Sequence, residues 1–341
     1  MILENIMQYV FLIVGFVLLI KGGDWFVDAA VSIAKRLKLP EVLIGATVVS
    51  IGTTLPEVMT SAMGAVGGAG EIAYGNAIGS IICNTALIAA ITIAIKPTKV
   101  NRKTLIFPVC FFFAVAAFYA VTAYCGGGFT RTTGIILLLG FVSYMLINIL
   151  SMKKNATGEE PYLTEAPNPT EDDKKDEKKE GSIVKSILML IVGAALIALG
   201  AYLLVESATS IAEQLGIPES VIGLTVVAIG TSLPEFVTAI TSLIKGHGAL
   251  SLGNIIGANI FNLVLVSGVA VTINPFPVPE NSLLFGKNAS LLLDIPVMLA
   301  VMGIMTIPVL CRGKLSRWQG ILLLGIYVAF MVIQFVFVRA I

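Results

Sequence analysis

The segment Gly45-Ala-Thr-Val-Val-Ser-Ile-Gly-Thr-Thr-Leu-Pro-Glu57 occurs a second time as Gly223-Leu-Thr-Val-Val-Ala-Ile-Gly-Thr-Ser-Leu-Pro-Glu235. Further along, Gly75-Asn76 through Asn84 returns as Gly253-Asn254 through Asn262, with the same offset of 178 residues. Each copy places an acid, hydroxyl side chains, proline and glycine inside apolar sequence. Such a repeat predicts two structurally equivalent halves. The polar interruptions predict a site at the interface between them.

The composition is that of a membrane protein. The chain has 341 residues, of which 57% are hydrophobic and 13% charged, and its mean hydropathy is +0.94. Ten apolar runs are long enough to cross a bilayer. We therefore predict an all-α integral membrane protein with ten transmembrane helices, surrounded by lipid. The predicted spans are 7–31, 40–66, 72–95, 104–124, 132–152, 183–211, 218–244, 250–273, 289–310 and 316–338.

The distribution of positive charge predicts the orientation of these spans. When the loops are assigned alternately to two faces, one face receives 18 Lys and Arg residues and the other receives 3. The positive-inside rule then places both termini outside a plasma (inner) membrane and the central loop in the cytoplasm. We expect a first five-helix repeat at 1–152, a charged linker at 153–181 and a second repeat at 182–341. Because five is odd, the second repeat is inverted relative to the first.

Glu57 and Glu235 are expensive inside a bilayer, at about 2–3 kcal/mol or more for a charged side chain. The predicted helices that surround them, 40–66, 72–95, 218–244 and 250–273, contain no Lys or Arg that could neutralise them. Either the two acids are protonated or a mobile cation balances their charge.

The neighbouring side chains favour a cation. Hydroxyl residues precede each glutamate by about one turn, and the prolines Pro56 and Pro234 are expected to disturb the helix, so that carbonyls can turn toward a ligand. Carboxylate, hydroxyl, carbonyl and amide oxygens suit Ca²⁺, Na⁺ or Mg²⁺. The hydroxyl residues are Thr53, Thr54, Thr231 and Ser232, and the carbonyls lie near Ser50 and Ala228.

The Gly-Asn-x-x-Gly segments that follow in each half have two interpretations. Their glycines permit close helix packing. Ser80, Asn84 and Asn262 continue at helical spacing and can complete an ion site. Elsewhere, Asp24 and Asp28 are expected to be interfacial or capping acids, and His247 to be a solvated loop residue. No nucleophile–base motif or nucleotide-binding motif is present, which argues against an enzyme, a cofactor or a nucleic-acid partner.

The doubled Gly-Thr-[Ser/Thr]-Leu-Pro-Glu segment, followed at fixed distance by Gly-Asn-x-x-Gly, resembles the alpha-repeats of the cation/calcium exchanger family, particularly the prokaryotic sodium/calcium exchangers. The resemblance implies an antiporter that exchanges Na⁺ for Ca²⁺ by alternating access. It implies that the second, third, seventh and eighth helices form the ion-binding core and that the first and sixth slide as a gate. The implied ion ligands are Glu57, Glu235, Thr53, Thr54, Thr231, Ser232, Ser80, Asn84, Asn262, Ser50 and Ala228.

Two positions depart from the family pattern. Ala258 replaces an expected hydroxyl residue, and Asn262 stands where many relatives carry Asp, which places the Na⁺ stoichiometry in question and weighs against K⁺ coupling. The alternatives are an H⁺/Ca²⁺ exchanger, a K⁺-dependent Na⁺/Ca²⁺ exchanger and, from another class, a cation channel. We expect the chain to function as a monomer.

Overall fold

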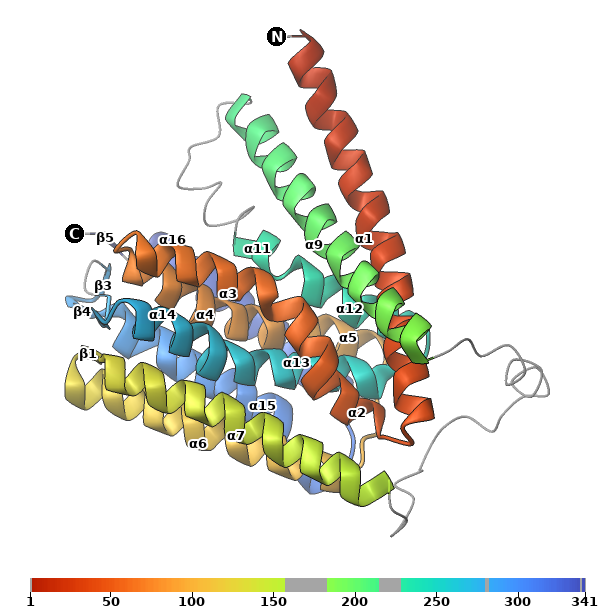
Figure 1. Cartoon of the computed structure of the whole chain (residues 1–341). Helices are drawn as coiled ribbons and strands as arrows, with labels where there is room; N and C mark the ends of the chain where they lie inside the picture. The colour runs from red at the N-terminus through yellow and green to blue at the C-terminus, as the bar shows by residue number, and fades with distance from the viewer. Residues whose placement is uncertain (1, 157–182, 215–227, 280–281, 338, 341) are drawn as a thin grey trace.

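The computed structural model describes residues 2–156, 183–214, 228–279, 282–337 and 339–340, and these are nearly all helical (Figure 1). The first half contains α1 (Ile2–Arg36), α2 (Glu41–Ile44), the π-helix η1 (Gly45–Val49), α3 (Ser50–Val66), α4 (Gly70–Cys83), the π-helix η2 (Asn84–Ala89), α5 (Ala90–Ile95), α6 (Arg102–Gly126) and α7 (Arg131–Ala156). The second half contains α9 (Ile183–Gln214), α11 (Ala228–Thr231), α12 (Leu233–Ile244), α13 (Gly248–Phe261), the π-helix η4 (Asn262–Val266), α14 (Ser267–Ile273), the π-helix η5 (Ser290–Asp294), α15 (Ile295–Arg312) and α16 (Arg317–Val336).

The predicted all-α membrane fold is confirmed. Within the described part of the chain, nine helical stretches are long and apolar enough to cross a membrane, and they coincide with nine of the ten predicted spans. The tenth prediction, 218–244, is described only from Ala228 onward, where α11 and α12 lie. Most of the predicted linker, residues 157–181, lies outside the described residues. Its first residues are helical, because α7 continues to Ala156.

Loops that were predicted to share a face lie together. Strand β1 (Gly128–Phe129) pairs with β2 (Phe276–Pro277), and β3 (Ser282–Leu284) pairs with both β4 (Lys287–Asn288) and β5 (Arg339–Ala340). At the opposite end of the bundle, Lys99 and Lys314 form an antiparallel bridge. These pairings agree with the alternating course of the predicted spans.

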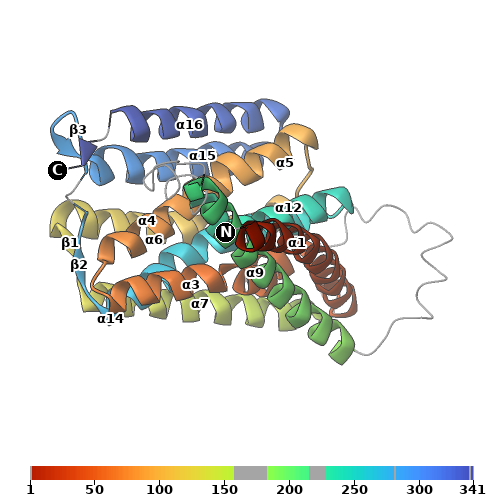
Figure 2. The same ribbon diagram turned by 90° about the horizontal axis from the view of Figure 1, so that it is seen from above.

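Helices α1 and α9 pack along each other and cross the remaining bundle obliquely (Figures 1 and 2). Their contact reveals the inverted symmetry. Gly15 and Gly22 of α1 are the repeat counterparts of Gly193 and Gly200 of α9. A Cβ at Gly15 would lie 2.9 Å from Gly200 O, and one at Gly22 would lie 3.0 Å from Gly193 O. Small residues here allow the two backbones to touch in an antiparallel, two-fold arrangement.

The centre of the bundle is formed by the two helices that carry the Gly-Asn-x-x-Gly segments. In the membrane span that begins with α13, 83% of the apolar stretch is buried, whereas the value for α16 at the periphery is 17%. The corresponding span of the first half, which begins with α4, is next at 72%. The asparagines of the Gly-Asn-x-x-Gly segments therefore lie on the spans with the largest buried share among those of the described residues.

Candidate ion-binding site

The two repeated glutamates lie in the interior. Glu57 is in the middle of α3 and Glu235 is in the first turn of α12, and both are fully buried. They come from the two halves of the chain and lie on helices that contact each other. Among the described residues, none of their four carboxylate oxygens has a hydrogen-bond partner. This is the arrangement expected of two acids that share an interior cation.

Two of the predicted hydroxyls are buried beside the acids without a partner. Thr54 Oγ1 and Ser232 Oγ make no hydrogen bond within the described part of the chain. Thr53 Oγ1, by contrast, donates to Asn254 Oδ1 at 3.3 Å. Thr231 ends α11, immediately before Ser232. Thr54 and Ser232 thus have hydroxyl oxygens without a partner among the described residues, whereas the Thr53 hydroxyl is already hydrogen-bonded to Asn254.

Asn84 and Asn262 occupy equivalent places in the two halves. Each is fully buried and begins a π-helix, η2 and η4 respectively. Neither amide oxygen nor amide nitrogen of either side chain has a partner among the described residues. π-Helical segments within α-helices frequently mark functional sites, because they change the direction of side chains and free backbone groups. Both asparagines thus fit the role predicted for them.

The backbone around the prolines differs between the halves. In the first half, α3 continues through Pro56 without a break. The irregular backbone of this half lies directly before α3, in the π-helix η1. At the start of α3, Ser50 O accepts a hydrogen bond from Thr53 Oγ1 at 3.4 Å. In the second half a break occurs at Ser232, and Pro234 falls in the first turn of α12, where its missing N–H costs nothing.

The remaining predicted ligands lie on α4 and α11. Ser80 lies on α4 and is 4% exposed. Ala228 begins α11, but its side chain lies outside the described atoms. Ala258, the position that lacks the expected hydroxyl, is fully buried on α13. No group of three or more His, Cys, Asp or Glu side chains gathers anywhere in the described ranges, so the candidate site consists of two carboxylates with neutral oxygens.

The sequence analysis missed the role of Asn254. Its Oδ1 accepts hydrogen bonds from Thr53 Oγ1 and Ser50 Oγ, each at 3.3 Å, and its Nδ2 donates to Thr238 Oγ1 at 2.9 Å. This one amide ties α3 of the first half to α12 of the second. In the other copy, Asn76 Nδ2 donates to Glu57 O at 3.0 Å and to Ser61 Oγ at 2.8 Å. The sequence did carry a signal for this role, because an Asn directly follows a Gly in both copies of the repeat.

The glycines of the second Gly-Asn-x-x-Gly segment bring α13 against η1 and α3, as one of the two interpretations predicted. A Cβ at Gly253 would lie 2.2 Å from Val42 O, and one at Gly257 would lie 2.3 Å from Ser50 Oγ and 2.6 Å from Ala46 Cα. These distances are shorter than any ordinary contact. The close approach is what allows Asn254 to reach Ser50 and Thr53.

Replacing Gly257 with Ala should therefore push α13 away from α3. We expect a loss of about 1–3 kcal/mol in the free energy of unfolding, as for overpacking elsewhere in a close-packed interior, measured by thermal unfolding in detergent. Gly325→Ala in α16 is the control, because a Cβ there meets no atom within 4 Å. Equal stabilities of the two variants would contradict this packing.

Taken together, the unpartnered oxygens form the set of donor atoms that a hard cation takes. A buried polar group without a partner costs about 1–3 kcal/mol, and a charged one costs more. Six predicted residues carry such atoms: Glu57, Glu235, Thr54, Ser232, Asn84 and Asn262. A hard cation satisfies carboxylate, hydroxyl and amide oxygens simultaneously.

Comparisons with known proteins agree with this chemistry. Residues 7–150 and 185–336 match the family described as "Sodium/calcium exchanger protein". The sodium/calcium exchanger MaX1 of Methanosarcina acetivorans is 33% identical, over 96% of this chain and 98% of that protein. The sodium/potassium/calcium exchanger 2 of Homo sapiens is 31% identical, but over only 40% of this chain and 21% of that protein.

The fold has close structural relatives as well. A structure of the sodium-calcium exchanger NCX_Mj, soaked with Na⁺ and Sr²⁺, superposes with a TM-score of 0.77 at 33% sequence identity. The similarity covers 95% of this chain and 98% of that one. The family match spans both halves and both buried glutamates, so this chain belongs to the sodium/calcium exchanger family of membrane transporters.

Proposed function

We propose that this protein is a secondary antiporter that exchanges Na⁺ for Ca²⁺ at a single site near the middle of the membrane, reached from the two faces in turn. The observation that carries the proposal is the pair of buried carboxylates, Glu57 and Glu235, which lie on two contacting helices and whose oxygens lack partners in the described structure. Family membership supports the identity of the transported ions.

Charge balance explains why one site can serve both ions. Two carboxylates neutralise one Ca²⁺ or two Na⁺, so either load removes the cost of burying the acids. Thr54, Ser232, Asn84 and Asn262 supply neutral oxygens that can complete the coordination of either ion. An empty, doubly charged site is the costly state, and this favours exchange over leakage of a single ion.

The inverted halves account for access from both faces. The α1–α9 pair contacts the bundle as a separate layer (Figure 2), and its two helices are related by the same symmetry as the site. When this pair moves relative to the bundle, each half takes up the packing that the other half had before. The ion site then opens to the opposite face of the membrane. The excess of Lys and Arg in alternate loops supports a plasma-membrane location with both termini outside.

The coupling ion can be tested directly. In proteoliposomes loaded with Na⁺, at equal pH and K⁺ on both sides, an outward Na⁺ gradient should accelerate ⁴⁵Ca²⁺ uptake at least about tenfold over Na⁺-free vesicles. If three Na⁺ exchange for one Ca²⁺, a membrane potential of 100 mV contributes about 2.3 kcal/mol per cycle. In a second set of vesicles that carries a K⁺ gradient, uptake should then respond to the potential that valinomycin imposes.

Other results would overturn the proposal. Uptake driven by a proton gradient alone would identify an H⁺/Ca²⁺ exchanger. A requirement for K⁺ together with Na⁺ would identify the K⁺-dependent alternative. Rapid uptake that needs no counter-ion would identify a channel.

A further inference from the structure

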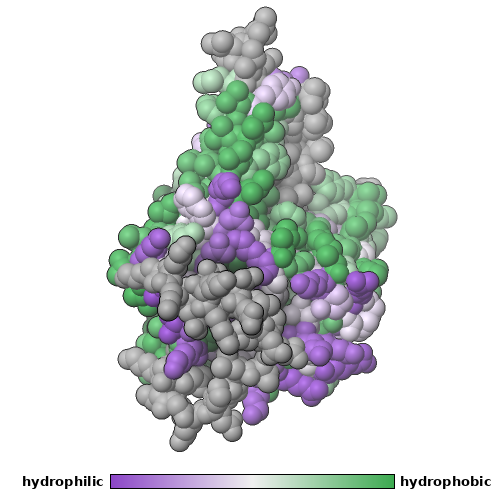
Figure 3. Space-filling model, turned by 90° about the vertical axis from the view of Figure 1, so that its right-hand side faces the viewer, coloured by the Kyte–Doolittle hydropathy of each residue, from purple (hydrophilic) through white to green (hydrophobic). Residues whose placement is uncertain are grey.

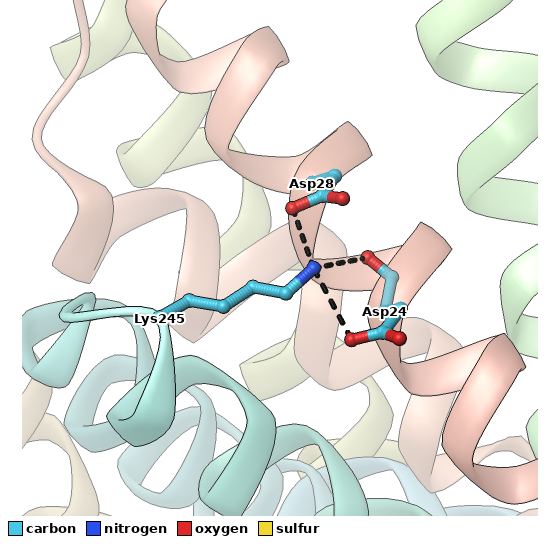
Figure 4. A network of polar contacts seen from close by, with 3 residues as sticks. All are labelled: Asp24, Asp28 and Lys245. Atoms are coloured by element: carbon cyan, nitrogen blue, oxygen red, sulfur yellow. Dashed lines mark hydrogen bonds and ion pairs between the residues drawn. The ribbon is translucent and has the colours of Figure 1, made fainter.

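An ion-pair network joins α1 to the turn that follows α12 (Figure 4). Lys245 Nζ lies 2.7 Å from Asp28 Oδ1 and 3.3 Å from Asp24 Oδ1, and it also donates to Asp24 O at 3.1 Å. The acids had been expected to be interfacial or capping residues. One ammonium group binds both of them across more than 200 residues of sequence. Figure 3 shows that hydrophilic side chains gather on the side of the molecule that faces right in Figure 1.

The turn that carries Lys245 is itself fixed to the bundle. Two residues further on, His247 Nδ1 lies 2.7 Å from Glu41 Oε1 at the start of α2, so the prediction of a merely solvated histidine is wrong. Below the network, Gly23 of α1 packs on α12, and a Cβ at Gly23 would lie 2.6 Å from Val237 Cγ1. Lys245 therefore holds α1 onto an anchored support.

The equivalent contact is missing from the other half. By the 178-residue offset, Lys245 corresponds to Gly67, which has no side chain to bind an acid. The stripe of α12 beneath α1, formed by Leu233, Val237 and Thr241, is half-buried. The corresponding stripe of α3, Leu55, Met59 and Met63, is 52%, 61% and 70% exposed. One end of the molecule is thus closed by α1, and the symmetry-related end is not closed in the same way by α9.

We propose that Lys245 is a positioning residue that acts as a latch, holding α1 against α12 and so keeping the ion site closed at this end until the α1–α9 pair moves. The proposal rests on the proposed exchange function and adds an asymmetry to it. Because the latch exists in only one half, the two access states differ in stability, and the state described here is the favoured one.

The size of this bias follows from the exposure of the charges. The side chains of Lys245, Asp24 and Asp28 are 25%, 40% and 56% exposed, so solvent screens the pairs and each is modest. Removing the ammonium should change the ratio of the two access states by about two- to fivefold, without unfolding the protein.

Disulfide trapping measures this ratio. A Cβ at Gly23 would lie 3.9 Å from Thr241 Cβ, a separation typical of disulfides. Gly23→Cys with Thr241→Cys, in a background with Val237→Ala and the four native cysteines replaced by Ala, traps the latched state. The repeat-related pair Met63→Cys with Ala201→Cys reports the opposite state. Cross-linking rates under a mild oxidant are followed in proteoliposomes by gel mobility.

We expect Lys245→Gln to slow the Gly23–Thr241 cross-link and to accelerate the Met63–Ala201 cross-link, each about two- to fivefold, while Lys245→Arg restores both rates. A general loosening of the structure would not move the two rates in opposite directions. Unchanged rates at both pairs would overturn the latch. The cross-linking rates can be measured whether or not the protein transports ions, so they test the latch independently. Absence of Na⁺-driven uptake in the unmodified protein would refute the exchange proposal without refuting the latch.

Discussion

Replacing either Glu57 or Glu235 with Gln is expected to abolish Na⁺-driven ⁴⁵Ca²⁺ uptake. Each substitution keeps the shape of the side chain but removes one of the two charges that balance Ca²⁺ in the interior. Removing one partner of a buried ion pair costs about 3–5 kcal/mol, which corresponds to a loss of more than a hundredfold in affinity. Equilibrium ⁴⁵Ca²⁺ binding to the purified variants should fall by the same factor.

The matched control removes an acid outside the site. Glu71 lies in the first turn of α4 and is exposed, so Glu71→Gln should retain uptake within about twofold. Both site variants should fold, because glutamine no longer carries the buried charge that the empty protein must tolerate. Normal uptake by Glu57→Gln would remove that residue from the site.

Asn254→Ala is expected to weaken both the fold and Ca²⁺ binding. The substitution removes an acceptor shared by Ser50 and Thr53 and the donor to Thr238, although Ser50 Oγ keeps its bond to Gly45 O at 2.7 Å and Thr53 Oγ1 keeps its bond to Ser50 O at 3.4 Å. Each hydrogen bond that is lost contributes about 0.5–1.5 kcal/mol, so the loss of these three should lower the free energy of unfolding by a few kcal/mol at most. Because the amide ties α3 to α12, the two glutamates lose their common support, and Ca²⁺ affinity should fall about 10- to 100-fold.

A buried asparagine elsewhere separates these effects. Asn148 in α7 is 2% exposed and donates one bond to Tyr144 O at 2.8 Å. Asn148→Ala should lower the melting temperature in detergent while leaving Ca²⁺ affinity nearly unchanged. If Asn254→Ala reduced stability only, and bound Ca²⁺ with normal affinity once folded, its role in positioning the glutamates would be contradicted.

The sequence predicted the features that repeat and the features that follow from hydropathy. Nine of the ten predicted spans agree with described helices within about five residues at each end, since the cost of burying polar backbone in lipid leaves few other solutions. Glu57 and Glu235 were predicted to be interior acids because neither has a basic partner in its own or neighbouring predicted helices. Their burial in both halves agrees with that argument.

Features that depend on contacts between the halves were not predictable. Leu-Pro-Glu stands in an unbroken helix at Pro56 but at the start of a helix at Pro234, although the local sequence is the same. Asn254 could equally have bound an ion or a neighbouring hydroxyl, and only the close approach at Gly257 decides between them. Lys245 finds its partners on α1, and no local pattern indicates which acids those are.

The most direct test of the shared carboxylate pair is diffraction from crystals soaked in Sr²⁺, a Ca²⁺ analogue with strong anomalous scattering. Our account predicts one principal anomalous peak that contacts oxygens of both Glu57 and Glu235, at little more than the 2.3–2.6 Å typical of Ca²⁺, and that fades as Na⁺ is raised at constant pH. A peak that contacts neither glutamate, or that persists unchanged in high Na⁺, would contradict it.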